Sequence, residues 1–261
     1  MFGRELLKDK VVLVSGATQG LGAEIARAAA REGAAGVAIT GRSDRGKSVA
    51  VELEELGVKA AFYRTDLADV SSAIDSVRRT ITDFGRVDCV VNAGGLTSRG
   101  SMLDTTPEVF DQHMAINVRA PFFIMSETIK HLVDSGRPGT IVNIISTAEL
   151  GGAPYLAPYS VAKAGLACAT RNAAHAHRWD RIRINGIDIG WTETEGEAET
   201  QKKFHGAADD WVEKANASVP MGKLGQIDEI AEFVVFLLSE RSGVVTGSVI
   251  DWDQNVQGGA D

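Results

Sequence analysis

Tyr159 and Lys163 are the residues whose types and spacing most directly suggest acid–base chemistry. They lie four positions apart in a helix-like stretch, which places both side chains on one face, one turn apart. A free tyrosine ionises near pH 10, and a neighbouring ammonium favours the phenolate and lowers that pKa toward the working range. Ser146 ends an apolar run and offers a hydroxyl that can hold a substrate oxygen. The three residues predict proton transfer at an alcohol or carbonyl oxygen, although the helical spacing alone also fits an ordinary surface pair.

A glycine-rich turn over residues 15–22 joins the first strand-like run to the first helix-like stretch, with the spacing G-x3-G-x-G. Glycine permits a tight turn and lets the backbone approach a pyrophosphate. The N-terminus of the following helix offers unpaired N–H groups and a positive dipole end to that anion. Because the turn follows the first strand of an alternating chain, it predicts a dinucleotide site rather than a plain turn.

The end of the second predicted strand bears on which dinucleotide binds. An acidic residue there would bond a free ribose 2′-hydroxyl and repel a 2′-phosphate, but no carboxylate stands at this turn. Arg42 can instead pair with a phosphate through two N–H groups and stack on adenine, which favours NADP(H). Asp44 lies close enough to leave NAD(H) possible. Asp66, after the third strand, can cap the next helix or accept a hydrogen bond from adenine.

Short apolar runs alternate with amphipathic stretches along the whole chain. Strands are predicted over 11–15, 37–40, 59–64, 89–92, 140–145, 183–189 and 248–252, and helices over 23–32, 48–56, 70–84, 107–116, 120–134, 160–176 and 227–239. This alternation implies parallel strands with crossovers on both faces, and therefore an α/β, Rossmann-like doubly wound sheet. We expect one domain over residues 1–261, with its ligands beyond the carboxyl ends of the strands.

Composition excludes several other functions. With 27 basic and 35 acidic residues the net charge is −8, so a wide cationic surface for nucleic acid or membrane lipid is not expected. Cys89 and Cys168 suit neither a disulfide framework nor a metal site, and we interpret both as small buried residues in a reducing cytoplasm. Residues 1–5 lack the apolar segment of a signal peptide, and the apolar run 233–238 is too short to span a bilayer.

Taken in order, these motifs resemble the short-chain dehydrogenase/reductase family over about residues 8–252. The 13-residue separation between Ser146 and Tyr159 is the one usual in that family. The other matches are the glycines of the turn, an aspartate after the third strand, Asn-Ala-Gly after the fourth, a helix asparagine and a lysine. In full, the matching residues are Gly16, Gly20, Gly22, Asp66, Asn92, Ala93, Gly94, Asn117, Ser146, Tyr159 and Lys163.

The resemblance implies a role for each member of the catalytic set. Tyr159 would be the general acid–base, and Lys163 would lower its pKa and hold the nicotinamide ribose. Ser146 would orient the substrate oxygen, and Asn117 would hold a water that links Lys163 to solvent. Hydride would pass between the nicotinamide and the carbon beside that oxygen. The resemblance also implies about seven strands and a homotetramer or dimer; the family's tetramers are often built from the helices that correspond to 107–134 and 160–176.

The expected cofactor site combines the turn, the strand ends and the catalytic helix. Its residues are Gly16, Thr18, Gln19, Gly20, Leu21, Gly22, Arg42, Asp66, Leu67, Asn92, Ala93, Gly94, Tyr159, Lys163, Ile189, Gly190 and Thr194. Two positions depart from the family pattern: Val91 replaces the first asparagine of Asn-Asn-Ala-Gly, and Ile189 replaces a proline and keeps an N–H. These departures bear on the nicotinamide pose rather than on the fold.

The substrate site is expected near Ser146, under a polar segment within about 191–220 that carries four glutamates between 193 and 199. We interpret this segment as a mobile lid. Glu149 could accept hydrogen bonds from substrate hydroxyls, and Trp191 could lie against a sugar ring. Both favour a neutral sugar or polyol over an acyl-carrier-protein thioester, which needs a basic docking patch.

Two alternatives stay open at this stage. The first is a ketone reductase, including 3-oxoacyl reductases, and the second is a cofactor-binding regulator without catalysis. The complete set of Ser146, Tyr159 and Lys163 speaks against the regulator. His175 and His177 lie far along the helix from Tyr159, and we interpret them as structural or interfacial, without a metal.

Overall fold

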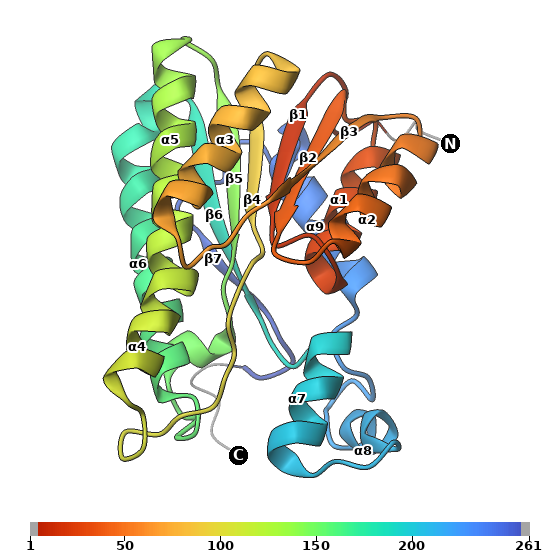
Figure 1. Ribbon diagram of the computed structural model, residues 1–261, viewed down its shortest axis with the longest axis vertical. Helices are drawn as coiled ribbons and strands as arrows, with labels where there is room; N and C mark the ends of the chain where they lie inside the picture. Colours follow the sequence, from red (N-terminus) through yellow and green to blue (C-terminus); the bar gives the residue numbers. More distant parts are fainter. Residues whose placement is uncertain (1–4, 257–261) are drawn as a thin grey trace.

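The computed structural model describes residues 5–256 as one domain built on a seven-stranded sheet (Figure 1). The two ends of the predicted domain, 1–4 and 257–261, lie outside the described residues. All paired strands run parallel, in the order β3-β2-β1-β4-β5-β6-β7. The strands are β1 (Val11–Ser15), β2 (Gly36–Gly41), β3 (Lys59–Arg64), β4 (Cys89–Asn92), β5 (Gly139–Ile144), β6 (Ile182–Ile189) and β7 (Val249–Trp252). The predicted doubly wound α/β fold is confirmed.

Helices cover both faces of the sheet (Figure 1). On one face lie α1 (Gly20–Arg31), α2 (Arg45–Glu55) and α9 (Ile227–Leu238), whose apolar residues share a core with Val12, Val14 and Ile187. On the other lie α3 (Val70–Phe84), α5 (Ala120–Asp134) and α6 (Ala157–His177), which pack with Leu13 and Ile184. Alternate strand residues therefore face different helix layers, as strand geometry requires.

The strand order reverses between β1 and β4, which are neighbours in the sheet although two strands separate them in sequence. Ser15 at the end of β1 pairs in register with Asn92 at the end of β4. Such a reversal opens a crevice beyond the carboxyl ends of the strands, because the chain leaves β1 and β4 toward opposite faces. The glycine turn and the Asn-Ala-Gly segment follow these two strands, so the topology brings them to the same crevice.

One helical run differs from the prediction. The expected helices over 107–116 and 120–134 are α4 (Pro107–Met114) and α5, and a π-helical turn, Ala115–Arg119, joins them without a break. A π turn inside a helix is rare and is often found at functional sites. Asn117 lies within this turn.

The segment within about 191–220, which we interpret from the sequence as a mobile lid, is largely helical. It contains α7 (Glu195–His205) and α8 (Trp211–Ala217), which lie beyond the end of β6 and apart from the two main helix layers (Figure 1). Trp211, Ala215 and Leu224 form a small apolar core of their own beneath it. The spacing Thr194-x-x-Glu197 is a sequence pattern that indicates the start of this helix. In the structure the Thr194 hydroxyl accepts a hydrogen bond from the Glu197 N–H at 2.9 Å and caps α7.

Three smaller expectations concern cysteines, metals and membranes. Cys89 is buried as expected, but Cys168 is exposed on α6, so its prediction as a buried residue was wrong. Among residues 5–256 no helix is long and apolar enough to cross a membrane. The same residues contain no group of three or more histidine, cysteine or acidic side chains arranged to hold a metal.

Candidate active site

The glycine turn is shaped by contacts that leave no room for side chains. Gly16 has φ +76°, and a Cβ on it would lie 2.3 Å from Cα of Gly94. A Cβ on Gly22 would lie 2.3 Å from the Gly16 carbonyl oxygen. Gln19 begins α1 without a side-chain cap, and the first turn holds no acidic residue. The helix N-terminus therefore keeps N–H groups available for an anion.

A groove of about 410 Å³ runs along this turn. The predicted cofactor residues that line it are Gly16, Thr18, Gln19, Gly20, Leu21, Gly22, Arg42, Asp66, Leu67, Ala93, Gly94 and Thr194. The groove also includes residues that the sequence analysis did not single out: Gly41, Ser43, Thr65, Gly95, Leu96, Ile116 and Gly196. A glycine-walled groove at the end of an uncapped helix suits the pyrophosphate and ribose groups of a dinucleotide.

Five predicted cofactor residues do not line this groove: Tyr159 and Lys163, which belong to the catalytic set described below, and three residues at strand ends. Asn92 is buried and its amide nitrogen donates a hydrogen bond to Oδ1 of Asn143 at 2.8 Å, which joins β4 to β5. Gly190 packs so closely on Asp253 that a Cβ would lie 2.0 Å from its Oδ1. Ile189 packs against the core beneath α1 and α9. These residues support the strand ends that the groove rests on.

The far end of the groove carries the positive charge expected near a ribose phosphate. Arg42 is exposed and lines the groove. Asp44, which left NAD(H) possible, forms ion pairs with Arg64 at 3.2 Å and with Lys47 at 3.5 Å. Arg45 donates a hydrogen bond from Nη1 to Oε1 of Gln19 at 3.0 Å, so a second arginine lies over the glycine turn.

Asp66 lines the groove but does not cap the following helix. Its Oδ1 accepts a hydrogen bond from the Ala68 N–H at 3.0 Å in the turn after β3. The cap of α3 is Asp69, whose carboxylate accepts from the Ser71 N–H at 2.9 Å. The capping role considered for Asp66 was therefore wrong, because the helix begins one turn later than that role requires.

The structure places Ser146, Tyr159 and Lys163 together at the carboxyl end of β5. Tyr159 and Lys163 lie in the first turns of α6, with exposed fractions of 8% and 4%. The Lys163 ammonium lies 5.6 Å from the centre of the Tyr159 ring and donates a hydrogen bond to the Ile144 carbonyl at 2.8 Å. Ser146 follows directly after β5, and its hydroxyl accepts from the Ala148 N–H at 3.3 Å.

Burial dominates the electrostatics of this set. It raises the pKa of the Tyr159 phenol to about 12, although a hydrogen bond with the Ser146 side chain and the Arg99 cation act to lower it. Burial also lowers the pKa of the Lys163 ammonium to about 8, and the Asp188 carboxylate opposes that fall. The depressed tyrosine pKa expected from the sequence is absent here, because the loss of water outweighs the neighbouring charges.

Asn117 anchors the backbone beside Lys163. Its Oδ1 accepts from the Leu96 N–H at 2.9 Å, and its Nδ2 donates to the Leu96 carbonyl at 2.9 Å. A Cβ on Gly95, the residue before, would lie 3.2 Å from Asn117 Oδ1 and 3.8 Å from Lys163 Nζ. The amide thus holds the segment after β4 against the catalytic helix.

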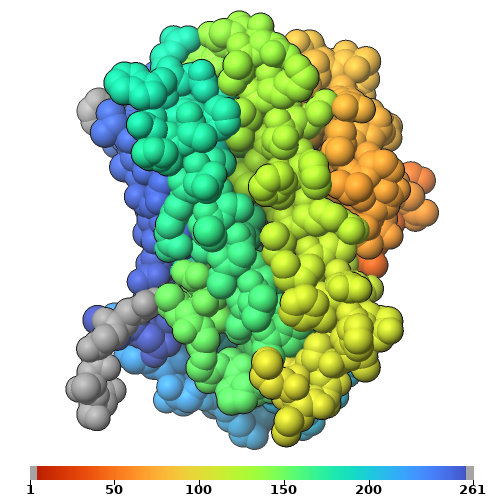
Figure 2. Space-filling view, turned by 90° about the vertical axis from the view of Figure 1, so that its left-hand side faces the viewer, coloured from red at the N-terminus to blue at the C-terminus, as the bar shows by residue number. Residues whose placement is uncertain are grey.

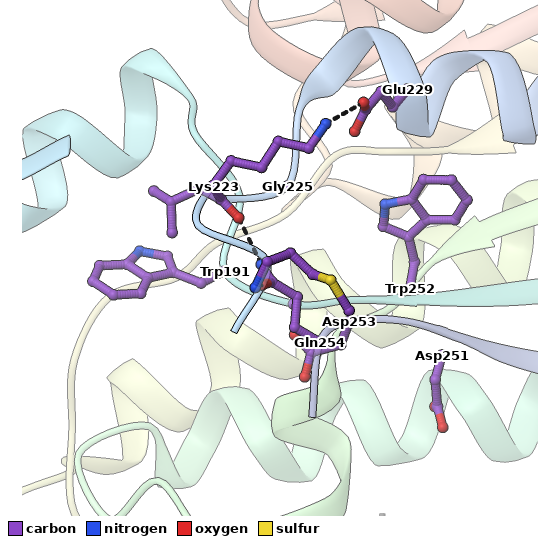
Figure 3. A pocket seen from close by; sticks show the side chains of 11 residues that line it. Trp191, Lys223, Gly225, Glu229, Asp251, Trp252, Asp253 and Gln254 are labelled. Atoms are coloured by element: carbon purple, nitrogen blue, oxygen red, sulfur yellow. Dashed lines mark hydrogen bonds and ion pairs between the residues drawn. The ribbon is translucent and has the colours of Figure 1, made fainter. Parts of the chain in front are cut away.

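The substrate-side residues are arranged differently from the prediction. Glu149 is largely buried and turned toward Arg171 of α6, at 3.7 Å from its Nη2. Trp191 donates from its indole nitrogen to Oε1 of Glu197 at 2.9 Å and lies beside Trp211, with ring centres 6.4 Å apart. Trp191 lines a separate cavity of about 260 Å³ between residues 221–225 and the end of β7 (Figure 3).

Glu197 and Arg99 are the charged residues that the structure adds near the phenol. The Glu197 carboxylate acts to raise the pKa of Tyr159, and the Arg99 guanidinium acts to lower it. Arg99 lies 5.4 Å from the Tyr155 ring and 5.9 Å from the Phe204 ring, so it spans the loop after β4 and the lid helix α7. The sequence analysis included Glu197 only as one of the four glutamates between 193 and 199 and did not single out Arg99, since neither residue belongs to a motif.

Known proteins resemble this chain over nearly its whole length. The family model described as enoyl-(acyl carrier protein) reductase matches residues 16–256. The chain belongs to the short-chain dehydrogenase/reductase family. An uncharacterized oxidoreductase of Thermotoga maritima is 35% identical to this short-chain dehydrogenase/reductase, with 97% of the chain and 98% of the relative covered. An L-rhamnose 1-dehydrogenase (NAD(P)(+)) of a Sphingomonas species is 32% identical, over 94% and 95%.

Among solved structures, a variant of actinorhodin polyketide ketoreductase with NADPH superposes on this short-chain dehydrogenase/reductase with a TM-score of 0.87. The two are 28% identical, over 94% of this chain and 96% of the other. The relatives' names include dehydrogenases and reductases. This short-chain dehydrogenase/reductase is accordingly an NAD(P)-dependent oxidoreductase that acts on CH–OH groups and the corresponding carbonyls.

Proposed function

We propose that this enzyme transfers hydride between a nicotinamide dinucleotide and a secondary alcohol of a neutral sugar or polyol, with Tyr159 as the acid–base. The observation that carries the proposal is the meeting of the Tyr159 phenol, the Lys163 ammonium and Ser146 beside the glycine-walled groove. When bound, the dinucleotide supplies the ring carbon that accepts or gives the hydride. The remaining chemistry falls to the side chains of the chain itself.

Each member of the set has a distinct task. The Ser146 hydroxyl holds the substrate oxygen, and the Tyr159 phenol takes the alcohol proton in oxidation and returns it in reduction. The Lys163 ammonium, fixed on the Ile144 carbonyl, offsets the charge of the phenolate. Asn117 is a positioning residue, because both of its polar atoms hold the Leu96 backbone beside that lysine.

A carboxylate near the Tyr159 phenol supports the proposed substrate class. The Glu197 carboxylate acts on the pKa of the phenol, and its Oε1 is fixed by Trp191 and by Gln201 at 2.7 Å. A fixed carboxylate is a good acceptor for substrate hydroxyls. The same charge opposes an acyl-carrier-protein partner, so the 3-oxoacyl reductase alternative is less well supported.

Arg42 supports NADP(H) as the favoured cofactor. It is exposed at the groove, and within residues 5–256 no carboxylate lies within ion-pair distance of it. Asp44 is occupied by Arg64 and Lys47, which weakens the case for a carboxylate on the ribose 2′-hydroxyl. The free guanidinium suits a 2′-phosphate, which it can bind through two hydrogen bonds.

A homotetramer in the cytoplasm is part of the same proposal. The helices α5 and α6 lie side by side over one face of the molecule (Figure 2). That face carries half-exposed apolar side chains, among them Phe122 at 50% and Val161 at 49%. Exposed apolar patches of this kind mark protein interfaces.

Both cysteines are free thiols, as in a reducing compartment. Small molecules, not nucleic acids or membranes, are the expected partners.

A substrate panel tests the proposal. The purified enzyme is given sugars, polyols, simple ketones and 3-oxoacyl thioesters with each of NADP+, NADPH, NAD+ and NADH, and turnover is followed by nicotinamide absorbance. We expect the highest kcat/KM for a polyhydroxy compound with the phosphorylated cofactor. Preference for 3-oxoacyl thioesters would replace the substrate class, and cofactor binding without any turnover would favour the non-catalytic regulator.

A further inference from the structure

Arg99, in the loop that follows β4, contacts the last turn of the lid helix α7. Its Nη2 lies 3.2 Å and its Nε lies 3.4 Å from Nε2 of His205, the last residue of α7. A guanidinium only donates hydrogen bonds, so this imidazole nitrogen is the acceptor. The guanidinium also lies 5.9 Å from the centre of the Phe204 ring. One cation therefore binds the two residues that end α7.

Tyr155, in the segment before α6, completes this cluster. Its ring centre lies 5.4 Å from the guanidinium and 5.7 Å from the centre of the His205 ring, which it meets edge-on. Its carbonyl accepts a hydrogen bond from the Gly100 N–H at 2.9 Å, so its segment is paired with the loop after β4. We call Arg99, Tyr155, Phe204 and His205 the mouth cluster. A cation beside aromatic rings is attracted to their faces.

The loop that carries this arginine is fixed to the catalytic part of the domain. The backbone N–H and carbonyl of Leu96 are both bonded to the Asn117 side chain at 2.9 Å. A Cβ on Gly100 would lie 3.5 Å from Cγ of Pro158, the residue before Tyr159. The loop thus crosses the first turn of α6, which carries the proposed acid–base.

The helix α7, by contrast, has few attachments of its own. None of its residues is buried, and Ala198 packs only against the small core around Trp211. At its first residue, Glu195 pairs with Arg45 of α2 at 3.4 Å. A helix of 11 residues is marginal in water by itself, so its order depends on such contacts.

The loop and α7 enclose a space that opens from the dinucleotide groove. Leu96 of the loop and Gly196 of α7 both line the groove. Further along the same two segments, Arg99 and His205 meet. With a dinucleotide in the groove, a substrate that reaches the Tyr159 phenol lies between these segments.

We infer that Arg99 is a positioning residue for the reaction: it holds the end of α7 over the mouth of the site, so that a bound polyol is enclosed beside Tyr159. The mouth cluster is the contact that breaks when substrate enters and product leaves. Closure excludes water and fixes the orientation of the substrate. Arg99 does not line the dinucleotide groove, so the cofactor binds whether the cluster is open or closed. The inference rests on the proposed function, which supplies the substrate.

Hydrogen exchange of residues 195–205, followed by mass spectrometry, tests the attachment of α7. Arg99→Ala removes the hydrogen bonds and the cation–π contacts together. It should speed exchange of the α7 amides by about tenfold, because the opening equilibrium sets the exchange rate. Lys214→Ala is the matched control, since Lys214 pairs at 2.8 Å with Asp210 at the start of its own helix, α8. It should leave α7 unchanged. Equal exchange of α7 in Arg99→Ala and wild type would overturn the inference.

His205→Glu tests the contact itself rather than the loss of a side chain. Within residues 5–256 the hydrogen-bond partners of Arg99 are the His205 ring and the Thr97 carbonyl, neither of which is a carboxylate. A carboxylate at position 205 would strengthen the attachment. Arg99→Ala should therefore cost α7 about two to five times more protection in the His205→Glu background than alone. An equal cost in both backgrounds would refute the contact.

Steady-state and single-turnover kinetics separate a lid role from a catalytic one. Arg99→Ala should raise KM for the best polyol by about tenfold, because the binding-competent closed state is less populated. The Kd for NADPH and the rate of hydride transfer at saturating substrate should stay close to wild type. A slower transfer with unchanged KM would contradict the inference. The exchange measurement needs no turnover, so its failure refutes the role of Arg99, whereas an enzyme without polyol activity refutes the proposed function.

Discussion

Gly16 and Gly94 lie in contact across the reversal of strand order, with 2.3 Å between Gly94 Cα and the position that a Cβ on Gly16 would take. Gly16 follows β1 and Gly94 follows β4, the two strands between which the crevice opens. The contact brings both turns to the same wall of the groove. The shape of the dinucleotide site therefore depends on the absence of side chains at this one point.

Gly16→Ala should lose both cofactor binding and stability. The substitution combines a positive φ of +76° with a clash against backbone that cannot rotate away. The two costs together lower the free energy of unfolding by about 2–5 kcal/mol. Urea denaturation measures the stability, and NADPH fluorescence measures the binding.

Gly57→Ala is the control for Gly16→Ala, since Gly57 has φ +89° and open space around it. It should cost only the backbone strain, about 1–2 kcal/mol, and leave NADPH affinity unchanged. If Gly16→Ala were no worse than Gly57→Ala in stability and in affinity, the contact between the two turns would not shape the site.

Arg42→Ala should weaken NADPH binding selectively. Removing a bidentate guanidinium–phosphate contact raises the Kd for NADPH by about tenfold or more, while the Kd for NADH changes little. Arg45→Ala is a matched variant, because Arg45 lies over the glycine turn rather than at the end of β2. It should affect both cofactors alike. Equal losses for NADPH and NADH in Arg42→Ala would refute the assignment of the 2′-phosphate.

Glu197→Gln should raise KM for the best polyol by about tenfold, because a charged hydrogen-bond acceptor is worth roughly 1.5–3 kcal/mol. The same change should lower the pKa of the Tyr159 phenol, since the Glu197 carboxylate raises it. Glu199→Gln, on the same helix but exposed, should leave both unchanged. Steady-state kinetics over pH separate the two variants, and an unaltered KM in Glu197→Gln would remove this carboxylate from the substrate site.

Asp88 should make stability depend on acid pH. Burial alone would raise its pKa, but hydrogen bonds from the Val11 N–H, Arg86 and Arg137 hold the pKa below its usual value. Its contribution is therefore complete above about pH 4 and lost as the pH falls through the lower, folded-state pKa.

Asp88→Asn tests this by costing about 1–3 kcal/mol in the free energy of unfolding at neutral pH, with the difference from wild type shrinking in acid. Asp75→Asn, at an exposed position on α3, should change stability by less than about 0.5 kcal/mol. Thermal or urea unfolding at several pH values provides the comparison. A difference that is independent of pH would mean that the carboxylate is not the stabilising form.

The sequence predicted the sheet and the positions of the catalytic set because both depend on local patterns. The first four residues of β1 are buried and apolar, and the spacing of Tyr159 and Lys163 is fixed by the helical repeat. The dinucleotide groove could be predicted because glycines follow directly after a strand. These features need no knowledge of which distant residues meet.

What the sequence missed depends on contacts between distant segments. Glu149 turns toward Arg171, whereas Glu197, on α7, is the glutamate that acts on the pKa of the phenol. Arg99 lies in a loop, and its contact with His205 appears only once α7 is placed beside that loop. The pKa of Tyr159 likewise could not be read from Lys163 alone, because burial is a property of the whole fold.

The most direct test of the account is hydride transfer by Tyr159→Phe, which removes one oxygen atom from the site. The variant should bind NADPH as tightly as wild type, because the phenol hydroxyl is proposed to act on the substrate oxygen. Its single-turnover rate with the best substrate from the panel should fall by about 10²-fold to 10⁴-fold, the usual contribution of a general acid–base. A variant that binds the cofactor and transfers hydride at the wild-type rate would contradict the central claim.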